Sequence, residues 1–475
     1  MVVGEIAEAV DLLVVGAGTG GYTAALRAAQ QGREVTLVDQ RLPEGLGGVC
    51  LHDGCIPSKM LIDAATRVAG TRTSRGAGVV GDLKFDPLLF QEHRRSTVDR
   101  LSQGIARLLD AQRVRLRQGK LRFTRPGAAV LHTDTDQAVF LEYQDVIIAT
   151  GSRPVELPGL PFDGSRIVSS TDVLKLDHLP ESILVVGGGY IGVELGTALA
   201  KLGVSVTIVE QADQLLPGMA ADLALPVQRR LRQLGVRVHL SSRLDDVDTR
   251  RVRITGPDGS HHLDAEMVLV SVGRRPNTDD LGLEALGLTV LPDGRVPVGP
   301  DRRLAPHVAA IGDCTAGPAL AHKASAESRV AVDALCGLPA AFDAIVPEVV
   351  FSDPPVAVTG ISAQALSEAG HDVSVARFPL SALGRAVAGG DTDGFARLIV
   401  DKSSGHLLGA QLVGSMAPEL IGEITFAIEM GATAEDLALT VHPHPTFSEQ
   451  LVEVASSALG SPIHLAAPAA KVVSR

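Results

Sequence analysis

Apolar residues gather in short runs along the chain, and two of these runs open the same pattern of strand, glycine turn, helix and strand. The first pattern occupies residues 11–39 and the second residues 183–210. An apolar strand that leads through glycines into a helix and a second apolar strand is typical of a parallel α/β unit. The sequence therefore predicts two such units.

Further along the chain, three apolar runs end in small residues, at 146–154, 267–277 and 308–314. We expect them to be returning strands that complete two parallel sheets. From about residue 347, strand-like runs alternate with amphipathic helices, and no further glycine turn of this kind follows. This change predicts a third domain of the α+β class.

The glycine turn of each unit has the G-x-G-x-x-G spacing of a dinucleotide-binding motif. An acid ends the second strand of each copy, and it follows the first glycine by 23 residues in both (39 − 16 and 210 − 187). The glycines allow the backbone to approach a pyrophosphate at the helix N-terminus, and the carboxylate accepts a hydrogen bond from a ribose hydroxyl. Two complete copies favour two dinucleotide sites over two purely structural turns. The residues are Gly16, Gly18, Gly21 and Asp39 in the first copy, and Gly187, Gly189, Gly192 and Glu210 in the second.

The composition contributes mainly by what it excludes. With 43 Lys+Arg against 55 Asp+Glu, the net charge of −12 argues against a nucleic-acid partner, which needs clustered cations. Apolar residues at 45% and charged residues at 21% are typical of a globular chain. No stretch reaches about 20 uninterrupted apolar residues, so we expect no membrane insertion. Acids near the N-terminus and only four cysteines favour a cytoplasmic protein.

Two of the cysteines lie in the segment GGVCLHDGCIPSKML, residues 47–61. Pro57 fits the first turn of a helix, and a helix N-terminus near Cys50 and Cys55 would favour the thiolate, the form that attacks disulfides. Lys59 would lie one helical turn after Cys55 on the same face. The segment favours a redox-active dithiol, and a zinc half-site and a structural disulfide are the alternatives.

Two acids are candidates for supporting this chemistry. Glu194 lies in an otherwise apolar helix, where a carboxylate is costly unless it faces water or a cation, so we favour a pair with Lys59 over an exposed position. Near the C-terminus, His442 and His444 are each followed by proline, and Glu449 is close enough to fold back onto an imidazole nitrogen. Such a carboxylate raises the basicity of the ring, which suits a general acid/base; plain surface histidines are the alternative.

Taken together, the motifs resemble those of the flavoprotein disulfide reductases. The cysteine segment, the two glycine motifs, ATGSRP, VGRRPNT, AIGD, LAHKA, GRA, DGFARLIVDK and HPHPTFSE occur in the order of that family, from about residue 11 to SPIHL near the end. The resemblance implies an α/β fold with two Rossmann-like dinucleotide-binding domains, for FAD and NAD, and a C-terminal α+β dimerisation domain.

The domain boundaries that we expect follow from these motifs. The first ten residues would be a loose lead-in, and the Pro-rich stretch 153–161 would be a linker. The expected ranges are 1–152 for the FAD-binding domain, 153–277 for the NAD-binding domain, 278–346 for a central segment that completes the FAD domain, and 347–475 for the dimerisation domain.

The resemblance also implies roles for individual residues. Cys50 would exchange with the substrate, Cys55 would face the flavin, and Lys59, paired with Glu194, would lie beside the flavin. His444, oriented by Glu449, would be the acid/base and would reach the dithiol from the partner subunit of a homodimer. FAD would lie on the first glycine motif and the nicotinamide nucleotide on the second. Further cofactor-binding residues would be Thr150, Gly151, Gly273, Gly312, Asp313 and Ala321.

Within this family the chain is most similar to the branch that oxidises protein-bound dihydrolipoamide and passes the electrons through FAD to NAD+. Glu210 is followed by Gln, Ala and Asp, which would repel a 2′-phosphate and therefore favour NAD over NADP. The implied partners are a second copy of the chain and the lipoyl-bearing acyltransferase of a 2-oxo acid dehydrogenase complex.

Two alternatives and one departure accompany this interpretation. The chain could be an NAD(P)H-dependent reductase of a small disulfide, or it could act as a docking subunit whose acidic charge suits a basic module. His52 and Asp53 stand where the family more commonly has Asn and an apolar or basic residue. A carboxylate inside the cysteine segment would disfavour thiolates.

Overall fold

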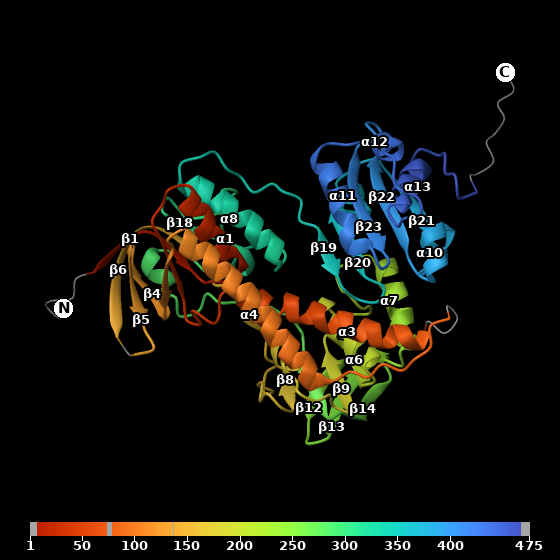
Figure 1. The fold of residues 1–475 in the computed structure, drawn as a ribbon, viewed down its shortest axis with the longest axis horizontal. Helices are drawn as coiled ribbons and strands as arrows, with labels where there is room; N and C mark the ends of the chain where they lie inside the picture. The colour runs from red at the N-terminus through yellow and green to blue at the C-terminus, as the bar shows by residue number, and fades with distance from the viewer. Residues whose placement is uncertain (1–6, 74–77, 136, 467–475) are drawn as a thin grey trace. The chain divides into compact units, whose positions relative to one another are not determined.

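The computed structural model describes residues 7–73, 78–135 and 137–466, which form two compact units (Figure 1). One unit joins the chain up to Glu181 to Glu266–Asp343, and the other joins Ser182–Ala265 to the chain from Ala344 onward. This division differs from the three domain boundaries expected from the sequence, which stay a prediction.

An eight-stranded sheet forms the centre of the first unit. Its parallel part has the order β18-β6-β1-β2-β3, while β17 and the pair β4-β5 join it in antiparallel fashion. The first predicted α/β unit and the returning strands that end in VII and VAA are therefore confirmed. The strands are β1 (Glu8–Val15), β2 (Val35–Asp39), β3 (Arg115–Gln118), β4 (Lys120–Arg125), β5 (Ala128–His132), β6 (Ala138–Ile148), β17 (Arg303–Ala305) and β18 (Val308–Ala310).

The start of β1 corrects one expectation from the sequence. The strand begins at Glu8 and pairs with β6 from that residue onward, so the prediction of a loose lead-in is wrong for residues 8–10. The hydrogen bonds of a parallel pair order these residues although their alternation of apolar and polar side chains is weak. The first six residues of the predicted lead-in lie outside the described residues.

Both faces of this sheet are covered. Leu12 and Val14 of β1 pack with helices on one face, whereas Leu13 and Val15 pack with strands β4, β5 and β6 on the other. A strand that is buried on both faces has a continuous apolar sequence, which explains the run LLVV. In Figure 1 the helices α1 and α8 lie side by side on their face of the sheet. The covering helices are α1 (Thr19–Gln30), α4 (Pro87–Ala111) and α8 (Ala321–Leu335).

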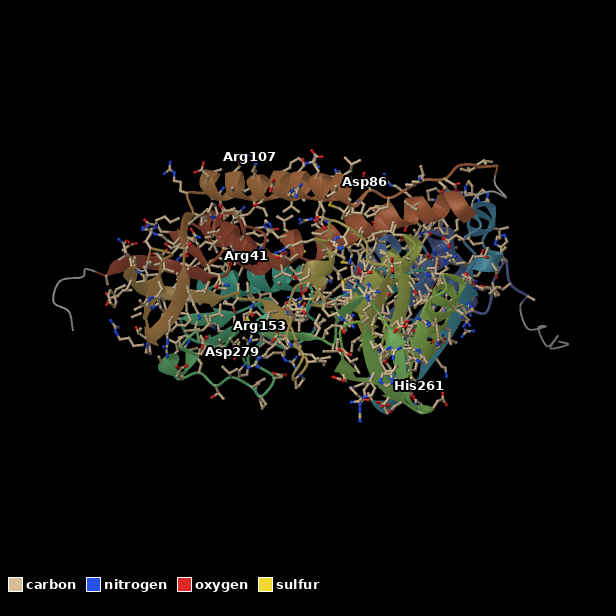
Figure 2. All side chains as sticks on the ribbon, turned by 90° about the horizontal axis from the view of Figure 1, so that it is seen from below. Arg41, Asp86, Arg107, Arg153, His261 and Asp279 are labelled. Atoms are coloured by element: carbon tan, nitrogen blue, oxygen red, sulfur yellow. The ribbon has the colours of Figure 1, made fainter. Side chains whose placement is uncertain are left out.

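Two long helices follow the first α/β unit, α3 (Cys55–Thr73) and α4. Only the start of α3 was predicted from the sequence, and α4 was not. The Asp86 side chain caps α4 by accepting hydrogen bonds from the backbone N–H groups of Leu88 and Leu89, at 3.0 and 3.1 Å. Figure 2 labels Asp86 at the start of this helix and Arg107 near its end.

Smaller elements complete the first unit. The strands β15 and β8 are parallel, and β16 and β7 are antiparallel, so apolar runs 146–154 and 267–277 each supply two strands. These elements are α2 (Gly48–His52), β7 (Ser152–Pro154), β8 (Ile167–Val168), α5 (Ser170–Val173), β15 (Met267–Val270), β16 (Arg274–Pro276), η2 (Leu283–Leu286) and η3 (Gly312–Cys314).

The second unit contains the second predicted α/β unit. Its strands β9, β10 and β11 are parallel, and the helix α6 connects β9 to β10. A separate antiparallel sheet of β12, β13 and β14 follows. The elements are β9 (Ser182–Val186), α6 (Tyr190–Lys201), β10 (Ser205–Val209), α7 (Ala221–Gln233), β11 (Arg237–His239), β12 (Arg243–Val247), β13 (Arg251–Gly256) and β14 (Gly259–Asp264).

The C-terminal part of this unit is an antiparallel sheet with the order β19-β20-β23-β22-β21. Buried apolar residues of α11, α12 and α13 pack against it in one core, so the predicted α+β domain is confirmed. None of the described helices is long and apolar enough to cross a membrane. The elements are β19 (Glu348–Val350), β20 (Val356–Gly360), α9 (Ala363–Glu368), β21 (Val373–Pro379), η4 (Leu380–Ala382), α10 (Gly384–Gly389), β22 (Phe395–Asp401), β23 (Leu407–Val413), α11 (Ala417–Glu429), α12 (Ala434–Leu439) and α13 (Glu449–Ala458).

Candidate active site

The first glycine motif forms the turn between β1 and α1. Gly16 has φ +107°, a left-handed conformation, and a Cβ added there would lie 2.3 Å from the carbonyl oxygen of Ala149. A Cβ at Gly21 would lie 1.7 Å from the carbonyl oxygen of Gly16, so the helix packs directly against the turn. Gly18 is the N-cap of α1, no side chain caps this helix, and its first turn holds no acid. Its N-terminal N–H groups are therefore suited to an anionic ligand.

The second glycine motif repeats this geometry between β9 and α6. Gly187 has φ +106°, and Gly189 is the N-cap of α6 with φ −71° and ψ −177°, close to the −68° and −177° of Gly18. Again no side chain caps the helix, and its first turn, which includes Gly192, holds no acid. The equal sequence spacing of the two motifs thus corresponds to equal backbone geometry, which fits two dinucleotides.

The acid of each copy lies at its own glycine turn. Asp39 is the last residue of β2, and its Oδ2 accepts a hydrogen bond from the backbone N–H of Ala17 at 2.8 Å. Glu210 directly follows β10, and its Oε2 accepts from the N–H of Gly188 at 2.6 Å. Both carboxylates are thereby held at the edge of the turn, where the ribose hydroxyls of a dinucleotide would reach them.

Other predicted FAD residues lie at the carboxyl ends of two neighbouring strands. Thr150 and Gly151 follow β6, Gly312 and Asp313 follow β18, and these strands are parallel neighbours. The hydroxyl of Thr150 is buried and has no hydrogen-bond partner within the described part of the chain. A Cβ added at Gly151 would meet no atom within 4 Å. A buried hydroxyl without a protein partner, next to open space at the first glycine motif, fits bound FAD.

A chain of hydrogen bonds holds Asp313 in place. The Ser152 hydroxyl donates to Oδ2 of Asp313 at 2.5 Å, and Arg274 donates to both the hydroxyl and the carbonyl of Ser152, at 2.8 and 2.6 Å. Gly273, with φ +136°, precedes Arg274, and its carbonyl accepts from the N–H of Val155 at 3.1 Å. A contact between Gly273 and a nicotinamide nucleotide stays a prediction.

A cluster of buried charges supports the Gly312 turn. Glu327 is fully buried, accepts from the N–H of Gly312 at 2.6 Å, and pairs with Arg302 at 2.9 Å and Lys323 at 3.0 Å. Lys323 also donates to the Gly312 carbonyl at 3.3 Å. Ala321 is the first residue of α8, the helix that carries Lys323 and Glu327. The cluster therefore attaches the turn to the start of this helix.

Cys50 and Cys55 lie on consecutive helices of the first unit. Cys50 belongs to α2 and is half-buried, and Cys55 is the first residue of α3 and is exposed. Pro57 lies in the first turn of α3, as the sequence predicted. The hydrogen-bonding contact with Cys55, followed by burial, raises the pKa of the Cys50 thiol, while the Thr19 hydroxyl and the charge of Lys59 act to lower it. The structure thus brings the two thiols together, with Lys59 on the same helix as Cys55. The N-terminus of α3 favours a thiolate at Cys55.

The two unusual residues between these cysteines are both anchored. Nε2 of His52 lies 2.8 Å from the carbonyl oxygen of Leu46, to which the ring donates. The buried carboxylate of Asp53 accepts hydrogen bonds from Arg41 at 2.8 Å and from Lys175 at 2.7 Å. Burial acts to raise the pKa of Asp53, but the bonds to Lys175 and Arg41 outweigh it and leave the pKa below its ordinary value. The charge that was expected to disfavour thiolates is therefore offset by two cations.

The two histidines near the C-terminus have different environments. The side chain of His442 is 6% exposed, its Nε2 lies 2.8 Å from Glu423 and its Nδ1 lies 2.9 Å from the Thr440 carbonyl. The side chain of His444 is 79% exposed, and its Nδ1 lies 2.8 Å from Oε1 of Glu449. The predicted contact of Glu449 with an imidazole is therefore confirmed. Of the two rings, only that of His444 keeps Nε2 accessible for proton transfer.

Glu449 is itself well fixed, because it is the first residue of α13. Its Oε2 accepts from the backbone N–H of Thr446 at 2.8 Å. Burial acts to raise the pKa of Glu449, but the bonds from His444 and Thr446 outweigh it and lower the pKa. The carboxylate therefore remains charged at neutral pH and holds the His444 ring in one orientation.

Glu194 lies within α6 and is only 4% exposed, so the alternative of a water-facing position is wrong. Its Oε1 accepts a hydrogen bond from the N–H of Phe351 at 2.9 Å, within the same unit. The predicted pair with Lys59 stays a prediction.

Four residues of the site were not predicted from the sequence: Ser152, Arg274, Arg41 and Lys175. Ser152 and Arg274 belong to the motifs ATGSRP and VGRRPNT, so these motifs held a signal for them. Arg41 and Lys175 belong to no motif, and only the fold shows that both reach Asp53.

A chain that carries both a dithiol and two glycine turns for dinucleotides has the features of a flavoprotein disulfide oxidoreductase. Comparison with protein families agrees, because the pyridine nucleotide-disulphide oxidoreductase model matches residues 10–328 and its dimerisation domain matches residues 346–455. The chain therefore belongs to this family. Its cofactors are FAD and NAD, as the resemblance implied, and the dimerisation domain supports a homodimer.

Named relatives indicate one branch of this family. Dihydrolipoyl dehydrogenase from Geobacillus stearothermophilus is 44% identical over 472 residues, which cover 98% of this chain and 99% of the relative. The enzyme of the same name from Halobacterium salinarum is 43% identical, with 98% and 99% covered. Among solved structures, LpdA from Mycobacterium tuberculosis has a TM-score of 0.86 at 29% identity and covers 94% of this chain and 99% of its own. The HOCl-induced flavoprotein disulfide reductase RclA from Escherichia coli has a TM-score of 0.82 at 27% identity, with 94% and 99% covered.

Proposed function

We propose that this chain oxidises protein-bound dihydrolipoamide to lipoamide and passes the electrons to NAD+. The observation that carries the proposal is the contact between Cys50 and Cys55 at the N-terminus of α3. The full-length similarity to dihydrolipoyl dehydrogenases supports this substrate over a small disulfide.

The chain's own side chains perform the exchange with the substrate. One substrate thiol attacks Cys50 of the Cys50–Cys55 disulfide, the S–S bond breaks, and Cys55 leaves as a thiolate. His444 accepts the proton of the attacking thiol at Nε2. The second substrate thiol then displaces Cys50 from the mixed disulfide, so that lipoamide leaves and two electrons and two protons have moved to the chain. Bound FAD would supply the redox chemistry that links the dithiol to NAD+, to which the electron pair would pass as a hydride.

Several groups prepare this reaction without taking part in bond exchange. The N-terminus of α3 and the charge of Lys59 favour the thiolate of the leaving Cys55. Glu449 fixes the tautomer of His444, with the proton on Nδ1. A Lys59–Glu194 pair would hold the ammonium group beside the flavin.

The proposal includes an assembly. His444 would serve the dithiol of the partner subunit, which makes the homodimer the active unit. The partner substrate would be the lipoyl-bearing acyltransferase of a 2-oxo acid dehydrogenase complex, and the net charge of −12 suits a basic docking module on it. We place the reaction in the cytoplasm, since a dithiol that cycles fits a reducing compartment.

A steady-state assay tests the proposal. Purified chain should oxidise dihydrolipoamide with NAD+ much faster than with NADP+, and Cys50→Ser should abolish the activity. Cys336→Ser is the matched control, because Cys336 is half-buried at the end of α8, and it should leave the rate unchanged. Faster turnover of NADPH with a low-molecular-weight disulfide would refute the assignment. An acyltransferase that still binds the Cys50→Ser chain would show that docking is separable from catalysis.

A further inference from the structure

The two cysteine helices are joined by a very short connection. Helix α2 ends at His52 and α3 begins at Cys55, so Asp53 and Gly54 alone connect them. The N–H of Asp53 donates to the carbonyl of Val49 at 2.9 Å, and a Cβ at Gly54 would lie 2.9 Å from the same oxygen. The conformation of this tight turn therefore sets the relative positions of the two thiols.

The Asp53 side chain attaches the turn to two other segments of the first unit. Arg41, labelled in Figure 2, follows β2 by two residues, and Lys175 follows α5 by two residues. The carboxylate is 7% exposed, whereas the side chains of Arg41 and Lys175 are 46% and 45% exposed. A buried carboxylate with two partners is fixed more firmly than an exposed ion pair, because leaving it without partners would be costly.

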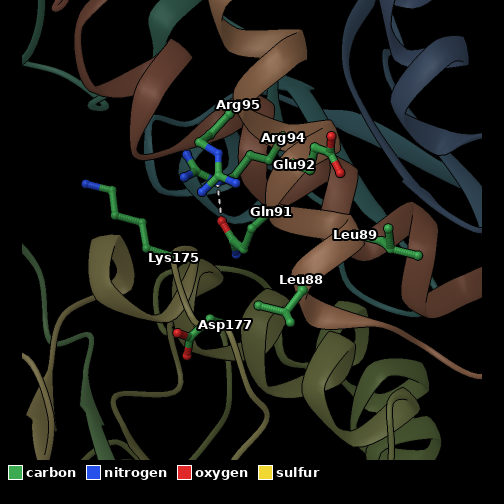
Figure 3. Close-up of a pocket in the computed structure, with 8 residues that line it drawn as sticks. All are labelled: Leu88, Leu89, Gln91, Glu92, Arg94, Arg95, Lys175 and Asp177. Atoms are coloured by element: carbon green, nitrogen blue, oxygen red, sulfur yellow. Dashed lines mark hydrogen bonds between the residues drawn. The ribbon is translucent and has the colours of Figure 1, made fainter.

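The segment that carries Lys175 is itself attached to α4. Gln91 donates to the carbonyls of Leu174 and Leu176 at 3.1 and 2.9 Å, and its Oε1 accepts from Arg94 at 2.7 Å (Figure 3). Lys175, Gln91 and Arg94 line a pocket of about 550 Å³, so the outer side of the ion pair is open to solvent. Through Lys175, Asp53 thus connects the cysteine turn to a segment that is itself hydrogen-bonded to α4.

We propose that Asp53, held by Arg41 and Lys175, is a positioning residue that keeps Cys50 and Cys55 adjacent after their disulfide has been reduced. The inference rests on the proposed function of this dithiol. Reduction breaks the S–S bond and adds two electrons and two protons to the sulfurs. The disulfide is more stable, and its reduction potential lower, when the reduced thiols stay close together. Releasing the turn therefore raises the potential.

Two substitutions distinguish positioning from a simple charge effect. Asp53→Asn removes a negative charge and Lys175→Met removes a positive one, so an effect of charge alone would shift the potential in opposite directions. Positioning predicts that both raise it, each by about a tenfold change in the equilibrium constant, or about 30 mV. The double variant should shift no further than the single variants, because all three lose the same contact.

The measurement is a redox titration of the FAD-loaded enzyme against NADH/NAD+ mixtures, with the free thiols of Cys50 and Cys55 counted by alkylation. Asp177→Asn is the control, because Asp177 lines the same pocket but pairs with His178, at 2.7 Å. The reduction potential of this variant should equal that of the wild type. If Asp53→Asn fails to bind FAD, the reduction potential of Lys175→Met alone tests the positioning role, because this substitution alters only a half-exposed side chain.

Unchanged potentials, or shifts of opposite sign, in variants with an intact dithiol would overturn the positioning role alone. A wild-type chain in which Cys50 and Cys55 never form a reducible disulfide would instead refute the proposed function, and the inference with it.

Discussion

At the scale of single residues, the segment HPHP shows how two histidines two positions apart acquire different properties. The ring of His442 is enclosed and both of its nitrogens are engaged, so it is suited to holding the loop. The ring of His444 is exposed and is oriented by a charged carboxylate, which is the arrangement of a general acid/base. The difference depends on Glu423 and Glu449, which lie on separate helices.

Substitution of each histidine by glutamine should separate these roles. His444→Gln should lower kcat for dihydrolipoamide oxidation by roughly 10²-fold or more, because the proton acceptor is lost. His442→Gln should instead lower the stability of the C-terminal domain and leave kcat per FAD-loaded enzyme nearly unchanged. Steady-state kinetics and thermal unfolding of both variants provide the comparison. A larger loss of kcat in His442→Gln than in His444→Gln would show that His442, and not His444, accepts the proton.

Thr150 allows a test of the FAD site that does not depend on activity. Its buried hydroxyl has no protein partner, so Thr150→Val should leave the stability of the FAD-free chain unchanged or slightly raise it. FAD affinity should fall by about fivefold, the loss of one hydrogen bond of about 1 kcal/mol. Flavin fluorescence on titration gives the dissociation constant. Thr197→Val, which removes a hydroxyl that donates to Val193 within α6, is the control and should not affect FAD.

At the scale of elements, the two glycine turns were predictable because their constraints are local. Both turns have a positive φ at the first glycine and a helix start without a capping side chain, and in the first turn the helix also approaches the turn closely. These constraints favour glycine at a fixed spacing. The cysteine turn was predictable for the same reason. Helix α4 was not predictable in this way, because it carries no motif. The bond between Asp53 and Lys175 joins segments remote in the sequence, and only the fold brings them together.

Gly21→Ala tests the close approach in the first glycine turn. The added methyl group would lie 1.7 Å from the carbonyl oxygen of Gly16, so the turn must open and FAD binding should be lost. Gly70→Ala, at a helical position of α3 with no atom within 4 Å of an added Cβ, should retain FAD and gain up to about 1 kcal/mol of stability. The flavin absorbance of the purified variants measures both outcomes. A Gly21→Ala chain that retains stoichiometric FAD would contradict the geometry.

At the scale of the whole molecule, the proposed mechanism draws the residues of one active site from two chains. The family match includes a dimerisation domain at residues 346–455, which contains His444 and Glu449. The dithiol lies in the part of the chain matched by the other family model, at residues 10–328. The sequence alone indicated both halves of the chemistry through their motifs, but motifs do not show which copy of a chain supplies each residue.

Complementation between two inactive variants determines this. Chains with Cys50→Ser and chains with His444→Gln should each be inactive as homodimers. If His444 serves the partner's dithiol, a mixed dimer contains one complete site and one site that lacks both residues. Random reassociation should then restore about one quarter of the wild-type activity, since about half of the dimers are mixed and each has one working site. A mixture that stays inactive after verified subunit exchange would show that both residues act within one chain.

The proposed function depends on a reducible Cys50–Cys55 disulfide in electronic contact with bound FAD. Stepwise anaerobic reduction of the FAD-loaded enzyme, followed by absorbance, tests it most directly. We expect uptake of two electron pairs per chain, with a long-wavelength absorbance from a Cys55 thiolate beside the flavin after the first pair. We expect uptake of only one pair in Cys50→Ser. Saturation of the wild type after a single electron pair, without that absorbance, would contradict it.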